Sequence, residues 1–191
     1  MKEINIDEIN EEYNKLIEKY SIKENDDKVH TRIHLMFDKA QNNLKIGRAI
    51  FTISQDNKLK DLLKLREDDT FYDWVIQASY YAMFHAVNAL LATKKIKILK
   101  IDVHRSALYA FCKNFIINKE LEEELFFIYE EAEEKALELF ASLSEEKKKR
   151  GFSAYERLSK MNIEPAKESL EHAQEFLEVI RNILANKNFI Q

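Results

Sequence analysis

Two histidines, two arginines and a tyrosine are the residues of this sequence that could move a proton or hold a phosphate. His85 lies inside an uncharged run, and His104 follows a basic segment and precedes Arg105. Histidine titrates near neutral pH, so either ring could act as a general acid or base. A buried histidine more often bonds a neighbour, and we expect that structural role for His85. Arg150 and Tyr155 bracket the segment RGFSAY, where a guanidinium could contact an anion.

The segment 94–105 is the only markedly basic loop of the chain. It holds five Lys or Arg against one Asp, whereas the whole chain has a formal net charge of −4. Nucleic-acid binding would therefore depend on a local patch of this kind. The candidate contacts for a phosphate-bearing ligand are Lys94, Lys95, Lys97, Arg105 and Lys149.

The composition argues against metal and glycine-loop chemistry. Two glycines in 191 residues exclude the usual phosphate-cradling loops. The single Cys112 excludes an internal disulfide and argues against a zinc site. His30 and His34 share a helix face, but no carboxylate completes a ligand set there. Residues 120–138 hold nine Glu and one Lys, which we interpret as a solvated acidic face. We therefore expect no metal and no cofactor.

The run from Trp74 to Thr93 is the element that must position these side chains. It is twenty residues long without a formal charge, and polar residues spread through it disfavour a membrane span. A helix that is apolar or weakly polar on every side is surrounded by protein, so we predict a buried central helix. Asp68, Asp69 or Thr70 is the expected N-cap.

Helical periodicity predicts the remaining elements. They are helices over 6–20, 28–53, 103–117, 120–143 and 162–184, with a short helical piece over 58–65. The scarcity of glycine and proline also favours an all-α fold, an up-and-down bundle of five or six helices. We predict an amphipathic helix and hinge over 1–27 and the bundle over 28–191. Gly47, inside a helix, indicates a close helix crossing.

Four segments, in order, resemble the HEPN domains (higher eukaryotes and prokaryotes nucleotide-binding domains). They are ASYYAMFHAVNALL (78–91), VHRSALYAF (103–111), RGFSAY (150–155) and EPAKESLEHAQEFLEVIRNIL (164–184). The resemblance implies a helical bundle, a homodimer and work on RNA. HEPN proteins commonly act as metal-independent ribonuclease toxins or defence effectors, paired with a nucleotidyltransferase antitoxin. The resemblance implies the same setting for this chain.

The chain departs from the pattern of the catalytic HEPN members. In those members an Arg, four to six further residues and a His meet across the dimer. No Arg of this chain has a His at that distance, and the positions after Arg150 are Tyr155, Glu156 and Arg157. A phenol titrates near 10 and is a poor base at neutral pH. By resemblance, the candidate catalytic residues are His104, Arg150 and Tyr155, and the candidate residues of the dimer interface are Tyr80, Tyr81 and His85.

Three functions stay open at this point. The one we favour is a HEPN-like module associated with RNA or nucleotide, non-catalytic, in a toxin–antitoxin or defence setting. The second is a metal-independent ribonuclease toxin whose histidine has moved to His104 or His85. The third is a helical scaffold whose acidic first and fifth helices bind a protein partner. The lone cysteine and the absence of an apolar leader in the first residues favour a cytoplasmic protein.

Overall fold

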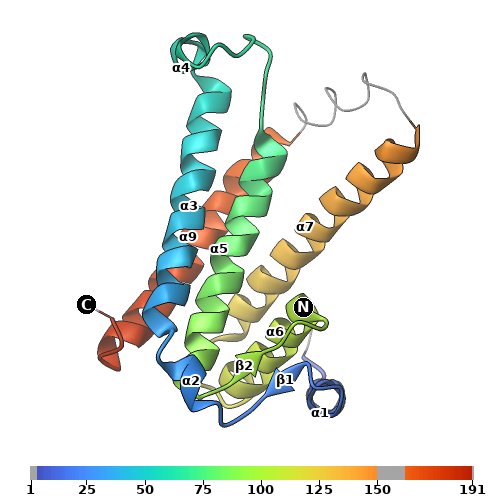
Figure 1. Cartoon of the computed structure of the whole chain (residues 1–191), viewed down its shortest axis with the longest axis vertical. Helices are drawn as coiled ribbons and strands as arrows, with labels where there is room; N and C mark the ends of the chain where they lie inside the picture. Colours follow the sequence, from blue (N-terminus) through green and yellow to red (C-terminus); the bar gives the residue numbers. More distant parts are fainter. Residues whose placement is uncertain (1–3, 150–161, 191) are drawn as a thin grey trace.

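A computed structural model describes residues 4–149 and 162–190, which form a helical bundle (Figure 1). A pair of two-residue strands is the whole sheet content of these ranges. The elements are α1 (Ile6–Glu18), β1 (Ile22–Lys23), α2 (Asp27–His30), α3 (Ile33–Gln55), α4 (Asn57–Leu62), α5 (Tyr72–Thr93), β2 (Lys97–Ile98), α6 (Val103–Phe111), the π-helical turn η1 (Cys112–Ile116), α7 (Glu123–Lys149) and α9 (Ile163–Asn186). The predicted all-α class is confirmed.

The predicted central helix is α5, which begins two residues earlier than expected. It packs against α3, α9 and α7, which run beside it in Figure 1, and against α6. The apolar residues that it buries completely are small or aliphatic: Val75, Ala82, Met83, Ala86, Val87, Ala89, Leu90, Leu91 and Ala92. Removing such apolar surface from water is the main favourable term in folding. No helix in the described ranges is long and apolar enough to cross a membrane.

The close crossing predicted at Gly47 is present where α3 passes α5 and α9. A Cβ atom at this position would lie 3.1 Å from Cδ2 of Leu170 on α9 and 3.4 Å from Cβ of Ala78 on α5. The first distance is shorter than an ordinary van der Waals contact. The missing side chain of Gly47 therefore lets three helices approach one another.

The helix predicted over 28–53 is divided in the structure. The single turn α2 ends at His30, and α3 starts at Ile33. Asp26 begins α2 by accepting a hydrogen bond from the Val29 amide at 3.1 Å, and Val29 is 2% exposed. Burial of Val29 and this cap hold the short turn at an angle to α3, which periodicity alone does not show.

The predicted N-cap of α5 is wrong. Phe71 occupies the N-cap position, and its amide donates to Oγ of Ser54 on α3 at 3.0 Å. Asp69 accepts instead from the Arg66 amide at 2.8 Å, in the turn before the helix. A side chain far away in the sequence therefore replaces the local cap, because α3 and α5 lie side by side.

The amino-terminal helix α1 packs against α6 and η1. Its buried face consists of Ile9, Tyr13 and Leu16, as the amphipathic pattern predicts. The chain then pairs Ile22 with Ile98 in the antiparallel ladder of β1 and β2. This pairing fastens the start of the chain to the loop that follows α5.

The helix predicted over 103–117 changes its geometry at Cys112. The first part is α-helical, and the residues from Cys112 to Ile116 form a π turn. Cys112, Phe115 and Ile116 are all buried. The turn also presents the carbonyl of Asn114 to the Lys94 ammonium at 2.7 Å.

The two long C-terminal helices follow their predicted positions closely. α7 begins at Glu123, three residues later than predicted, and α9 begins after Asn162, as predicted. Asn162 also donates to the Asp73 carboxylate of α5 at 2.5 Å. The turn predicted at Gly151 lies outside the described residues.

Candidate functional site

One side of α5 is left uncovered, although the sequence predicted burial on every side. Trp74 is 59% exposed, and Tyr81, Phe84, His85 and Asn88 are partly exposed. Their spacing of three, four and seven residues places them on one helix face. We call these five residues the α5 stripe. The central helix is therefore both the core of the bundle and part of its surface.

His104 lies beside the α5 stripe and contacts Tyr80. The Tyr80 hydroxyl oxygen and His104 Nδ1 are 2.5 Å apart, and the His104 and Phe84 ring centroids are 5.0 Å apart. Burial lowers the pKa of His104 and raises the pKa of Tyr80 well above its usual value. The ring is thus neutral at pH 7 and the phenol keeps its proton. Tyr80 can donate that proton to Nδ1, which leaves the imidazole proton on Nε2.

A buried carboxyl group lies behind Tyr80, on α7. The Tyr80 ring stacks on Tyr129 with centroids 6.1 Å apart, and Glu133, one turn further along α7, is 8% exposed. Burial and the neighbours Glu130 and Glu134 raise the pKa of Glu133 to about 7. Its Oε2 atom has no hydrogen-bond partner among the described residues.

Glu133 corrects the expectation that the acidic face of α7 is wholly solvated. Its neighbours Glu131 and Glu134 are exposed, but Glu133 faces the core together with Tyr129 and Ala136. Residues 129, 133 and 136 are four and three apart, so they share a helix face. This spacing from Tyr129 is the sequence signal that could have identified Glu133.

A recess of about 240 Å³ lies between α3 and the lower part of the α5 stripe. We call it the α3–α5 recess. Its lining residues are Arg32, Leu35, Met36, Lys39, Phe84, His85, Asn88, Ile98 and Val103. Burial, and then the Lys39 charge, lower the pKa of His85, so this imidazole is also neutral at pH 7. Arg32 and Lys39 are exposed and form no ion pair within residues 4–138 and 162–190.

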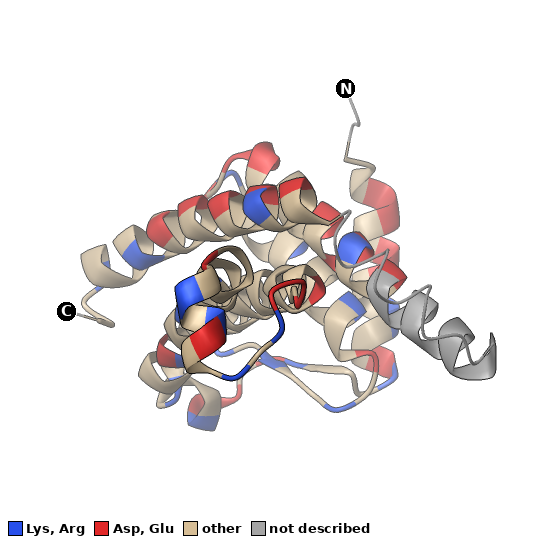
Figure 2. Cartoon of the chain, turned by 90° about the horizontal axis from the view of Figure 1, so that it is seen from above, with Lys and Arg blue, Asp and Glu red and all other residues tan. Residues whose placement is uncertain are grey.

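The basic loop behaves differently, because four of its five cations meet acidic partners. The ion pairs are Lys94–Glu120, Lys95–Asp27, Lys97–Asp26 and Arg105–Glu12. Exposed pairs contribute little stability, yet each cancels a charge that a phosphate would need. The partners lie on α1, on α2 and before α7. Figure 2 shows acidic and basic positions interleaved over the bundle rather than gathered on one basic face.

The predicted site residues therefore fall into separate groups. Tyr81, His85 and His104 come together around the α5 stripe, with Tyr81 and His104 ring centroids 6.0 Å apart. Tyr80 is 3% exposed and belongs to the core behind them. Arg105 is directed to α1 instead.

Three further candidates cannot be placed beside this group. Arg150, Tyr155 and the side chain of Lys149 lie outside the described residues. Within the described ranges, no three His, Cys, Asp or Glu side chains gather as a metal site would require.

Comparison with known proteins agrees with this bundle and with the predicted family. The family model of the HEPN domain matches residues 56–183. The match covers well over half of the chain, so the chain belongs to the HEPN domain family. The family predicted from the four sequence segments is confirmed.

A curated relative adds a more particular likeness. The chain is 45% identical over 62 residues to a protein of Methanocaldococcus jannaschii named Putative toxin MJ0142. The aligned part is 32% of this chain and 40% of that protein, so the chain spans less than half of its relative's length. No solved structure matches the chain.

The buried carboxyl group makes stability depend on pH in a defined direction. The pKa of Glu133 rises from 4.5 to about 7 on folding, so between these values the folded chain holds a proton that the unfolded chain has lost. Stability therefore falls as pH rises through this window. Glu133→Gln should remove that slope and raise the free energy of unfolding at pH 8 by roughly 1–2 kcal/mol. Urea unfolding followed by circular dichroism between pH 5 and 8 measures this.

Glu138→Gln is the matched control, because Glu138 is an exposed glutamate on the same helix that is not among the charges raising the pKa of Glu133. We expect its stability curve to follow the unmodified chain. An identical pH slope in the Glu133→Gln variant and the unmodified chain would show that Glu133 is not the titrating group.

Proposed function

We propose that this chain is an RNA-binding HEPN module that acts in a toxin setting. The observation that carries the proposal is the α3–α5 recess, where cations without acidic partners border an aromatic ring. Support for the setting comes from membership of the HEPN family and from the name of the curated relative. By family resemblance, the protein partner is a nucleotidyltransferase antitoxin. The acidic outer faces of α1 and α7 are the surfaces that would bind this partner.

The recess has the parts that single-stranded RNA recognition uses. An unstacked base can pack on the exposed part of Phe84, and Arg32 and Lys39 can hold the flanking phosphates. The amide nitrogen of Asn88 donates to the Phe84 carbonyl at 2.8 Å, which fixes this side chain and leaves its oxygen for a base edge. Neutral His85 adds one donor and one acceptor.

This binding should depend on salt through a small number of phosphate contacts. Each cation that contacts a single-stranded phosphate contributes about 0.7 to the slope of log affinity against log salt. We expect Arg32→Ala and Lys39→Ala each to lower the slope by about that amount and to weaken binding several-fold. Fluorescence anisotropy of a labelled 12-nucleotide RNA between about 20 and 200 mM salt measures both quantities.

Lys58→Ala is the control, since Lys58 is an exposed lysine on α4, away from the recess. It should leave the slope unchanged. If all three variants lose affinity equally, RNA contacts the chain through diffuse charge and the recess is not its site.

We also propose that the chain forms a homodimer through the upper part of the α5 stripe. Trp74 is 59% exposed on α5, and Leu35 and Ile46 are 55% and 52% exposed on α3. Leu35 and Ile46 are three helical turns apart and so share a face. Leu35 borders the α3–α5 recess, which places this apolar row beside the stripe. Contiguous exposed apolar residues mark interaction surfaces.

The dimer has a direct test by mass. The chain is 22.7 kDa, so light scattering coupled to size exclusion should give about twice that mass. We expect the Trp74→Glu, Ile46→Glu double variant to elute as a monomer, because two buried charges would face each other in the interface. Leu62→Glu on α4, at a leucine that is 77% exposed, should stay dimeric. A mass of 22.7 kDa for the unmodified chain at about 50 µM would contradict the proposal.

One observation favours catalysis as a second candidate function. The Tyr80 hydroxyl and His104 Nδ1 are 2.5 Å apart, which orients a neutral imidazole at the surface. Such a ring could take the proton of a ribose 2′-hydroxyl as that oxygen attacks the adjacent phosphorus. The bond to the 5′-oxygen then breaks and that oxygen takes up a proton from water, so that a 2′,3′-cyclic phosphate and a 5′-hydroxyl end result.

Catalysis by His104 predicts RNA cleavage in the presence of a chelator. We expect His104→Ala to lower the cleavage rate by at least about 100-fold, the contribution typical of a general base. Tyr80→Phe should lower it less, because the ring loses only its orienting hydrogen bond.

His30→Ala is the control. Equal rates in the His104→Ala variant and the unmodified chain would exclude His104, and gel analysis of a labelled RNA distinguishes these outcomes.

A further inference from the structure

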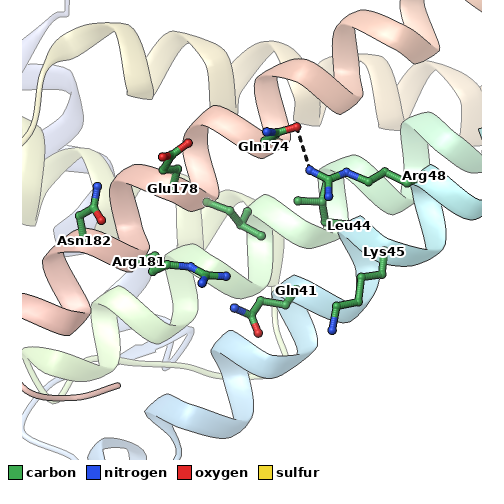
Figure 3. A pocket seen from close by; sticks show the side chains of 9 residues that line it. Gln41, Leu44, Lys45, Arg48, Gln174, Glu178, Arg181 and Asn182 are labelled. Atoms are coloured by element: carbon green, nitrogen blue, oxygen red, sulfur yellow. Dashed lines mark hydrogen bonds between the residues drawn. The ribbon is translucent and has the colours of Figure 1, made fainter. Parts of the chain in front are cut away.

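A second and larger recess lies between α3 and α9, on the other side of α3 from the α3–α5 recess. Its volume is about 500 Å³, within the range of small-molecule sites. We call it the α3–α9 groove. Figure 3 shows its lining residues, which are Gln41, Leu44, Lys45, Arg48, Gln174, Leu177, Glu178, Arg181 and Asn182.

Two arginines face this groove from opposite walls. Arg48 comes from α3, and its Nη2 donates to Oε1 of Gln174 on α9 at 2.8 Å, as the dashed line in Figure 3 shows. Arg181 comes from α9, and its guanidinium carbon lies 5.8 Å from the centroid of the Phe37 ring. These contacts hold both groups in place before a ligand arrives, which lowers the entropic cost of binding.

The charge of the groove is positive and unpaired. Lys45, Arg48 and Arg181 oppose a single acid, Glu178, so the lining has a formal charge of +2. Figure 3 shows the Glu178 carboxylate directed away from both guanidinium groups. Neither arginine forms an ion pair within residues 4–138 and 162–190. A guanidinium suits the oxygens of a phosphate, and the net charge matches a phosphate dianion.

The rest of the lining is suited to a flat organic group. Leu44 and Leu177 are 8% and 5% exposed and provide an apolar surface. The carboxamides of Gln41 and Gln174 provide donors and acceptors beside it. Pockets that bind small molecules combine apolar walls with a few placed polar groups in this way.

We propose that the α3–α9 groove binds a phosphomonoester, with the phosphate between Arg48 and Arg181 and a flat organic group against the two leucines. A free nucleotide and the 5′-phosphorylated end of an RNA share this chemistry. The site is independent of the α3–α5 recess, because Leu44 and Arg48 lie on the opposite face of α3 from Leu35 and Lys39. A result that contradicts the phosphomonoester site would therefore leave the proposed RNA-binding function untouched, and the reverse also holds.

Calorimetric titration of the full chain with AMP, adenosine and inorganic phosphate tests the site. We expect AMP to bind with a dissociation constant on the order of 100 µM, phosphate more weakly, and adenosine below detection. Arg48→Ala and Arg181→Ala should each weaken AMP binding by at least about tenfold. Arg48→Lys, which keeps the charge but loses the planar fork, should give an intermediate value.

Lys58→Ala, at an exposed lysine of α4, is the control and should bind AMP like the unmodified chain. A second arm compares a short RNA with a 5′-phosphate against the same RNA with a 5′-hydroxyl. A preference for the phosphate that Arg181→Ala abolishes identifies an RNA end as a ligand, and AMP binding without that preference identifies a free nucleotide. Either result supports the proposal. It is overturned if neither phosphorylated probe binds better than its unphosphorylated counterpart, or if the double arginine variant binds AMP normally.

Discussion

The enclosure of α5 is the constraint on which the rest of the structure depends. This helix has no charged face to offer to water, so α3, α7 and α9 must cover most of its surface. Small residues allow these helices to pack closely against α5. Gly47 lets α3 approach α5 and α9, and alanines such as Ala82 and Ala86 are fully buried. The uncovered stripe belongs to the same rigid element. Its aromatic and imidazole rings are therefore held by the packing of the core, as a binding site requires.

The distribution of charge decides which surfaces remain available to an anion. The chain is acidic overall, and four of the five cations in the basic loop after α5 form ion pairs with residues of α1, of the start of α2 and of the segment before α7. Those contacts attach the amino-terminal segment to the bundle. On α3 and just before it, Arg32 and Lys39 on one side and Arg48 on the other form no ion pair within residues 4–138 and 162–190. Local neutralisation thus reduces the anion-binding potential of the loop and leaves that of α3 unchanged.

The sequence was sufficient for the helices and the family because both depend on local patterns. Periodicity placed α1, α6 and α9, the uncharged run placed α5, and four segments, including the one around Tyr81 and His85, carried the HEPN resemblance. The break before Ile33 and the Ser54 cap of α5 depend on contacts between helices and could not be seen locally.

The same reason limits what could be predicted of the site. The contact between Arg105 and Glu12 joins residues 93 positions apart, and that between Arg48 and Gln174 joins residues 126 apart. No local pattern in the sequence indicates that the cations of the basic loop form ion pairs, and none indicates the α3–α9 groove. Glu133 is the exception, since its spacing from Tyr129 was present in the sequence but was outweighed by the surrounding glutamates.

The position of α3 has a consequence for how this protein can diverge. The family match begins at residue 56, after α3 has ended at Gln55, yet α3 forms a wall of both the α3–α5 recess and the α3–α9 groove. The opposite walls come from α5 and α9, inside the matched region. A substitution on α3 can therefore alter the α3–α5 recess or the α3–α9 groove without changing any residue of the matched region. The matched region alone holds only one wall of each.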